Sequence, residues 1–170
     1  GEVMSIGKTY KEAFQKAIRS LETGRYGLGF AKDLNRKSLE ELMNMLNHPS
    51  SERQFIMYEA LRKGAEIDEL YKRTFIKRWF IQQMKELVEE EEEILSWKGQ
   101  MLPDDMLVQA KKNGFSDRYL SALLGVGEKE IRTRRISLGL TGAWEAVPVS
   151  GVKNASYYFS TYNASGKIPV

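Results

Sequence analysis

Long proline-free intervals are the feature that most limits what this chain can fold into. Its four prolines lie at positions 49, 103, 148 and 169, so the intervals 50–102 and 104–147 contain none. Proline interrupts the interior of a helix, and its absence over such lengths leaves room for helices. Apolar residues there recur every three or four positions, as in an amphipathic helix. Before residue 140 nothing alternates with the period of two typical of a strand. The sequence therefore predicts an all-α fold.

Start and stop signals divide the chain into eight predicted helices. Capping-box spacings begin at Thr9 and Ser38. Several apolar stripes are followed by a glycine, as at the C-terminal ends of helices. The predicted helices are 9–23, Ser38 to His48, Ser50 or Ser51 (as the cap) to Gly64, 67–74, 77–96, Pro103 to Gly114, Ser116 to Gly125, and Gly127 to Gly139. We expect a compact bundle of about seven or eight helices.

The helical region also repeats itself at an offset of 50 residues. Ala60, Gly64, Leu70 and Ile81 recur as Ala110, Gly114, Leu120 and Ile131. Each copy would be a helix, a glycine, a short helix, a turn and a longer helix, which predicts a helix-turn-helix-like duplication. Beyond residue 140 the composition shifts to Gly, Ser, Val, Tyr and Asn. This shift is typical of an extended C-terminal tail or linker.

Composition excludes several kinds of chemistry. The chain has no Cys and one His, His48, which excludes disulfide scaffolds, thiolate catalysis, Cys-ligated zinc and any mechanism that needs a His pair. The 26 basic and 23 acidic residues nearly balance, and the resulting formal net charge of +3 does not by itself indicate nucleic-acid binding. No apolar run approaches the roughly 18 residues of a membrane span, so no membrane contact is expected.

Three local motifs have plainer explanations than a binding site. The acidic run 89–93 cannot direct all its carboxylates to one cation, because successive helix residues point in different directions, so a solvated face is expected. The glycine-rich loop 24–29 lacks the spacing and the Lys-Ser/Thr ending of a phosphate-binding loop. His48 precedes a proline, where capping or surface exposure is expected.

DNA binding is the alternative function that the sequence suggests. Residues 116–124, a Gly-Val-Gly turn and residues 128–138 resemble a DNA-binding helix-turn-helix, with Arg132 and Arg135 on the second helix. Against this interpretation, Glu128 and Glu130 occupy the turn that normally meets base edges and would repel phosphate. Compact helical folds use the same corner merely to pack. The alternative therefore stays open from the residues alone.

Several motifs resemble those of one enzyme family in order along nearly the whole chain. They are GEVMSIGKT (1–9), AFQKAIRSLE (13–22), SER (51–53) with ALRKG (60–64), KRWF (77–80), AKKNGFSD (110–117), LLG (123–125) with EIR (130–132), and YYFSTY (157–162). These motifs resemble the middle of the carbamoyl-phosphate synthase large subunit. Residues 146–155 depart from the Val-Asp-Thr-Cys-Ala-Ala-Glu stretch usual there, which leaves open whether the pathway is arginine or pyrimidine biosynthesis.

The resemblance implies a domain organisation and a role. Residues 1–23 would end the preceding ATP-grasp unit, 24–140 would form a helical oligomerisation domain, and 141–170 would be a linker to the second synthetase half. The parent would be a cytoplasmic ATP-dependent ligase that makes carbamoyl phosphate from bicarbonate, glutamine-derived ammonia and two ATP. Its partners would be the flanking ATP-grasp domains, a glutaminase small subunit and further copies of itself.

The resemblance assigns little chemistry to these residues. The ATP sites, with Mg or Mn, would lie outside the segment, so no catalytic, cofactor or metal residue is expected here. Glu2 matches an acid that lies by the passage between the two sites of the family, although an ordinary carboxylate beside a helix is equally compatible. Trp79 and Phe80 are candidates for association, or else core residues. Arg132 and Arg135 are candidates for docking.

Overall fold

The computed structural model describes residues 2–21, 23–29, 31, 33–147 and 157–164. Over this part the chain forms eight α-helices and one two-stranded antiparallel sheet. The helices are α1 (Tyr10–Ser20), α2 (Leu39–Met45), α3 (Arg53–Arg62), α4 (Ile67–Thr74), α5 (Arg78–Leu95), α6 (Asp104–Lys112), α7 (Asp117–Leu124) and α8 (Glu128–Ser137). The strands are β1 (Ala143–Ala146) and β2 (Tyr158–Thr161). The predicted helical bundle is confirmed.

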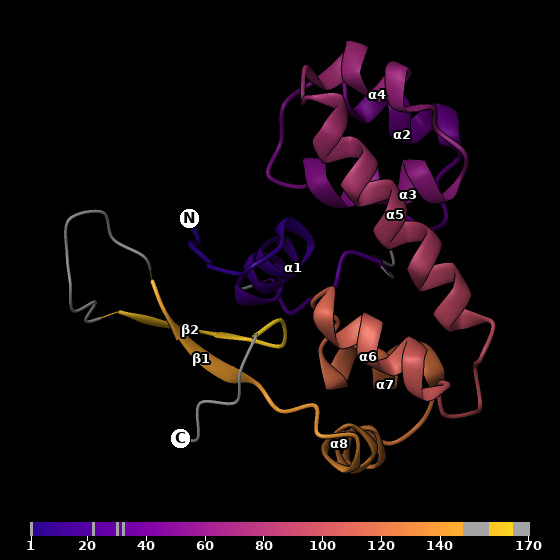
Figure 1. The fold of residues 1–170 in the computed structure, drawn as a ribbon. Helices are drawn as coiled ribbons and strands as arrows, with labels where there is room; N and C mark the ends of the chain where they lie inside the picture. Colours follow the sequence, from indigo (N-terminus) through magenta and orange to yellow (C-terminus); the bar gives the residue numbers. More distant parts are fainter. Residues whose placement is uncertain (1, 22, 30, 32, 148–156, 165–170) are drawn as a thin grey trace.

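The 18-residue helix α5 connects two groups of helices. Figure 1 shows α2, α3 and α4 around its N-terminal half, and α6, α7 and α8 beyond its C-terminal half. Helix α1 lies beside the two strands, between these groups. Because α5 contacts α1, α3, α4 and α7, its buried side chains Ile81, Leu87 and Ile94 belong to one continuous core.

Most of the predicted helix ends are confirmed. Thr9 and Ser116 cap α1 and α7 by accepting a backbone N–H, and Ser38 forms a complete capping box. The predicted cap of the third helix is wrong. Glu52, and not a serine, occupies the N-cap of α3, and its side chain makes no capping hydrogen bond. Helix α1 also ends at Ser20, because Leu21 adopts an extended conformation.

The duplication is present in the helices and in their connections. Helices α3, α4 and α5 are followed by α6, α7 and α8 with nearly the same spacing. The first connection of each copy contains a glycine with positive φ, 93° at Gly64 and 96° at Gly114. The paired apolar residues are also equivalent in burial, since Leu70, Leu120, Ile81 and Ile131 are all 0% exposed. Each copy therefore buries the same stripe.

The second connection differs between the copies and allows a test. Phe75 occupies the left-handed region at φ 56°, where its counterpart is Gly125 at φ 68°. A residue with a Cβ is disfavoured in this region by about 1–2 kcal/mol. Because Phe75 is 79% exposed, packing of its side chain offsets little of this cost. We expect Phe75→Gly to stabilise the chain by about 0.5–1 kcal/mol after the entropy cost of glycine. Thermal unfolding checks this prediction, with Gly125→Ala as the reverse control; a lower melting temperature for Phe75→Gly would contradict it.

The tail forms a small sheet that covers one side of α1. Ala143 pairs with Thr161 and Ala146 with Tyr158. One face of the sheet, with Glu145 and Thr161, is turned toward α1, and Lys8 reaches Glu145 at 3.1 Å. The connection at 148–156, which includes most of the divergent stretch 146–155, lies outside the described residues.

Candidate functional site

A buried carboxylate ties the two ends of the described chain together. Glu12, on α1, is 2% exposed. It accepts hydrogen bonds from the Thr161 hydroxyl at 2.8 and 3.0 Å, from the Tyr162 N–H at 3.2 Å and from the Asn163 side chain at 2.9 Å. It also accepts the Lys8 N–H at 3.0 Å, in the segment that enters α1. One side chain therefore holds both the entering and the leaving segment.

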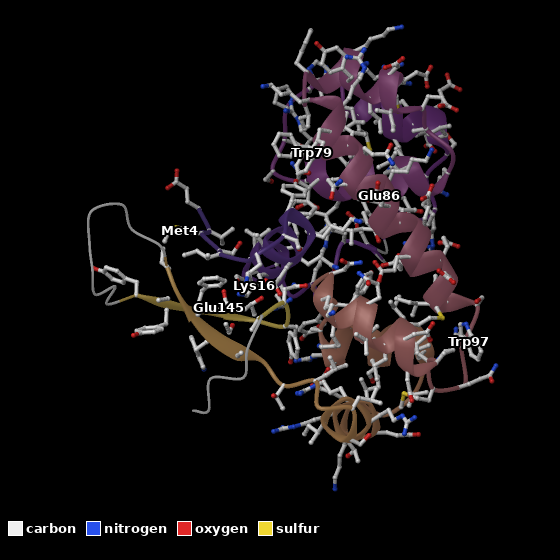
Figure 2. The ribbon with its side chains drawn as sticks, in the orientation of Figure 1. Met4, Lys16, Trp79, Glu86, Trp97 and Glu145 are labelled. Atoms are coloured by element: carbon white, nitrogen blue, oxygen red, sulfur yellow. The ribbon has the colours of Figure 1, made fainter. Side chains whose placement is uncertain are left out.

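A second tie between the same segments comes from the next turn of α1. The Lys16 ammonium donates to the carbonyl oxygen of Ser160 at 2.6 Å and to that of Ile6 at 2.7 Å. Figure 2 shows Lys16 close to Glu145, between α1 and the sheet. Burial lowers the pKa of Lys16, while nearby Glu12 acts in the opposite direction. The entry and exit of the chain thus form one unit, which we call the clasp: residues 5–16 and 158–163.

A second polar network lies between the two groups of helices. Glu91 of α5 is 0% exposed and accepts a hydrogen bond from the Tyr119 hydroxyl of α7. The Tyr119 oxygen accepts the Gly29 N–H at 3.0 Å. Arg62 of α3 forms ion pairs with Glu91, and with Glu59 at 3.4 Å. Burial raises the pKa of Tyr119 above the ordinary value for a phenol, so it donates its proton over the whole physiological range. This network connects α3, α5, α7 and the loop before α2.

These contacts correct the interpretation of the acidic run. Glu89, Glu92 and Glu93 are exposed, as expected, but Glu91 is buried and Glu92 pairs with Arg62, so the run is a solvated face only in part. The side chain of Glu90 accepts a hydrogen bond from Asn113 at 2.8 Å, and burial raises its pKa. The glycine-rich loop is likewise structural: it closes over Tyr119. Among the described residues, no group of His, Cys, Asp and Glu could hold a metal ion.

An aromatic cluster forms where α1 meets α5. Tyr10 stacks on Phe14 at 5.3 Å between centroids, and contacts the rings of Trp79 at 5.3 Å and Phe80 at 5.1 Å. Trp79 is 55% exposed and Phe80 39% exposed, so neither is a buried core residue. Phe80 also lines a cavity of about 230 Å³ with Tyr10, on the core side of the cluster. Trp79, labelled in Figure 2, has the larger exposed fraction and is the more available of the two for a partner.

Helix α8 does not present a free basic face. Arg135 donates to Asp117 at 2.7 Å and to the carbonyl oxygen of Leu140 at 3.1 Å, so it closes the corner between α7 and the tail. Arg134 forms a two-pronged pair with Asp104, at 2.8 and 2.6 Å. Arg132 is exposed on the outer side. The geometry therefore gives no support to the DNA-binding alternative, because one of its two named arginines holds the fold together.

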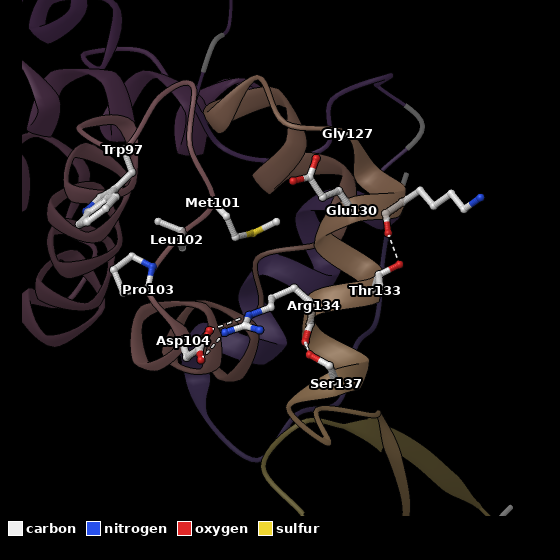
Figure 3. A pocket seen from close by; sticks show the side chains of 11 residues that line it. Trp97, Met101, Leu102, Pro103, Asp104, Gly127, Glu130, Thr133, Arg134 and Ser137 are labelled. Atoms are coloured by element: carbon white, nitrogen blue, oxygen red, sulfur yellow. Dashed lines mark hydrogen bonds and ion pairs between the residues drawn. The ribbon is translucent and has the colours of Figure 1, made fainter.

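A groove lies between α8 and the segment that joins α5 to α6. It has a volume of about 1080 Å³. Trp97, Met101, Leu102 and Pro103 form one side, and the exposed face of α8 forms the other (Figure 3). The Arg134–Asp104 pair closes one end, as the dashed lines show. No local pattern predicts this groove, because its walls are brought together by the α7–α8 corner.

Glu2, the remaining candidate from the sequence, lies in none of these networks, clusters or grooves. Glu2 is exposed in the segment before α1, and its role beside a passage stays a prediction. Glu12 and Glu91 organise the structure, and neither is a candidate from its sequence pattern. Glu12 lies three positions after Thr9, as in a capping box, but its carboxylate accepts the N–H of Lys8 and not that of Thr9, and its other partners are about 150 positions away. Among the described residues, no helix has the length and apolar character needed to cross a membrane.

Comparison with known proteins gives a consistent result. Residues 2–139 match the family model described as the oligomerisation domain of the carbamoyl-phosphate synthetase large chain. A large chain of Archaeoglobus fulgidus is 40% identical over 95% of this chain, and the match covers 16% of that relative. The N-terminal section of the large chain of Aquifex aeolicus is 39% identical over 95% of this chain, and the match covers 29% of that relative.

A plant relative extends the comparison. The arginine-specific, chloroplastic large chain of Arabidopsis thaliana is 36% identical over 96% of this chain, and the match covers 14% of that relative. This chain therefore spans a minor part of each relative. Neither the family match nor these relatives support the DNA-binding alternative.

Proposed function

This chain belongs to the oligomerisation-domain family of the carbamoyl-phosphate synthetase large chain, and from that premise we propose that it holds the flanking synthetase units in register. The proposed parent is an ATP-dependent ligase of the cytoplasm, although the plant relative is named chloroplastic. It would use bicarbonate, glutamine-derived ammonia and two ATP, with Mg or Mn at sites outside this segment. A glutaminase small subunit and further copies of the chain would be its partners.

The clasp is the observation that carries this proposal. Because Glu12 binds both the entering segment and the segment around residue 161, the chain leaves the domain beside the point where it enters. In a polypeptide that continues on both sides, the two flanks then start from one rigid place. A labile carbamate that moves between two catalytic halves requires such fixed geometry. We divide the chain as 1–23, 24–140 and 141–170, with the clasp formed by the first and last parts.

The test weakens the clasp in the full-length large chain with its glutaminase partner. Glu12→Gln replaces an acceptor oxygen by an amide group that faces donors, so the Thr161 segment should loosen. We expect bicarbonate-dependent ATP hydrolysis to persist, whereas the carbamoyl phosphate formed per ATP consumed falls severalfold. Glu89→Gln, at an exposed position of α5, is the matched control. An unchanged ratio in Glu12→Gln would reject the proposed role of the clasp.

Self-association is the second part of the proposal, and Trp79 is its candidate residue. A half-exposed tryptophan beside Tyr10 and Phe80 is the kind of side chain that often dominates interface energy. We expect Trp79→Ala to shift the sedimentation of the parent toward smaller species, with little change in the melting of this domain. Phe80→Ala should lower the melting temperature, because Phe80 also lines the inner cavity. Trp144→Ala, at a tryptophan 47% exposed on the sheet, is the control. Unchanged sedimentation of Trp79→Ala would remove α5 as the association surface.

A further inference from the structure

The duplication identifies the counterpart of the large groove. Subtracting the offset of 50 from the groove residues Asp104, Glu130 and Arg134 gives Gln54, Phe80 and Met84. These three residues line the cavity of about 230 Å³ beside α1. The two hollows therefore overlap at these positions of the unit, one on α5 and the other on α8, whereas the wall 97–103 belongs to the groove alone.

In the first copy this place is occupied by a helix. Tyr10 of α1 lines the cavity with Gln54, Phe80 and Met84, and its ring contacts Trp79. Further along α5, about two turns after Trp79, Lys11 pairs with Glu86 at 2.6 Å. Helix α1 thus lies along the face of α5 and inserts an aromatic anchor. The second copy has no such helix among the described residues, and its groove is open.

We propose that the groove between α8 and residues 97–104 receives an amphipathic helix from the remainder of the same large chain, seated as α1 is on α5. This inference rests on the proposed function, since it places the domain within a longer polypeptide. The matched segment covers 16% of the large chain of Archaeoglobus fulgidus. Most of a large chain of that length lies outside the matched segment and could supply the helix. A tethered helix meets the groove at a millimolar effective concentration, and a surface with a polar rim is then sufficient to bind it.

The groove also defines the chemistry of the helix that it accepts. Trp97, Met101 and Leu102 provide an apolar wall for an aromatic or large aliphatic anchor, because Glu130 and Arg134 stand where the first copy has Phe80 and Met84. Ile136, 49% exposed, stands where the first copy has Glu86, so the occupant carries an apolar residue where α1 has Lys11. Lys129 is an exposed cation in the lining of the groove, and it favours acidic residues along the edge of the helix. Arg132 is exposed but does not line the groove, so its docking role stays a prediction, and Arg135 is engaged within the fold.

Photo-crosslinking in the full-length large chain tests the proposal. Thr133→p-benzoylphenylalanine places the probe at the groove wall, on an exposed position of α8. Gln83→p-benzoylphenylalanine is the equivalent position in the first copy, one turn from Trp79 and Glu86, and it should capture α1. Mass spectrometry of the cross-linked peptides identifies what lies in each place. We expect the Thr133 probe to capture a helical peptide of the same chain from outside residues 1–170.

Each other outcome decides against the proposal. Capture of a second copy or of the small subunit overturns it but leaves the proposed self-association standing, because sedimentation of the Trp79 variant tests that separately. Capture by the Gln83 probe without any by the Thr133 probe shows an empty groove and also overturns it. Thr133→Arg gives an independent measurement: hydrogen exchange in the captured helix should rise clearly, and Thr133→Ser should leave it unchanged. Unchanged hydrogen exchange of that helix in Thr133→Arg would contradict its binding in the groove.

Discussion

Arg62→Leu is expected to destabilise the folded chain by about 3–5 kcal/mol, because it leaves the buried Glu91 carboxylate without its cation. Glu91 is 0% exposed, so water cannot take the place of the guanidinium. Tyr119 still donates one hydrogen bond to it, which does not balance the charge. For a domain of this size each kcal/mol lowers the melting temperature by about 2–4 °C, so calorimetry should show a large shift.

Two further variants isolate the buried charge as the cause. Arg134→Leu removes an arginine from the exposed pair with Asp104, and it should cost no more than about 1 kcal/mol. Arg62→Leu combined with Glu91→Leu removes both charges and should recover part of the lost stability. A double variant as unstable as Arg62→Leu alone would show that packing of the arginine, and not the charge on Glu91, is responsible.

The helices were predictable because each carries its own signals. Ser38 with Glu41 and Ser116 with the stripe that follows fix helix starts within a few residues, without information from the rest of the chain. The duplication was visible for the same reason, since Gly64 and Gly114 are needed locally by their connections. Where the local signal was weaker, the prediction failed: two serines before α3 offered a cap, and neither is used.

The organising polar residues could not be predicted, because their partners are distant in the sequence. Glu91 looks like its four acidic neighbours, and only Arg62 and Tyr119, 28 or more positions away, make it different. Glu12 meets Thr161 across 149 positions and a stretch with no helical pattern. The groove beside α8 was equally hidden, since its walls are joined only when the second copy folds. Local patterns thus gave the fold, whereas the candidate sites depend on long-range contacts.

Gly27→Ala is expected to have an effect of similar size for a steric reason. A Cβ at this position would lie less than 3.0 Å from ring atoms of Tyr119. The ring is 4% exposed and its hydroxyl is fixed between Glu91 and Gly29, so it cannot move aside. Overpacking of a core costs about 1–3 kcal/mol, and the rigidity of this ring places the expected loss at about 3 kcal/mol. Chemical denaturation of the variant measures it, and Gly142→Ala, whose Cβ would meet only one atom at 4.0 Å, is the control.

The same substitution also tests whether the loop and the network act as one unit. If Gly27→Ala displaces Tyr119, the hydrogen bond to Glu91 is already weakened before Arg62 is removed. The combined loss in Gly27→Ala with Arg62→Leu should then be smaller than the sum of the separate losses, by about 0.5–3 kcal/mol. Strict additivity would mean that the loop packs on α7 without contributing to the network. The loop before α2 would then cover the α3–α5–α7 junction without helping to hold it.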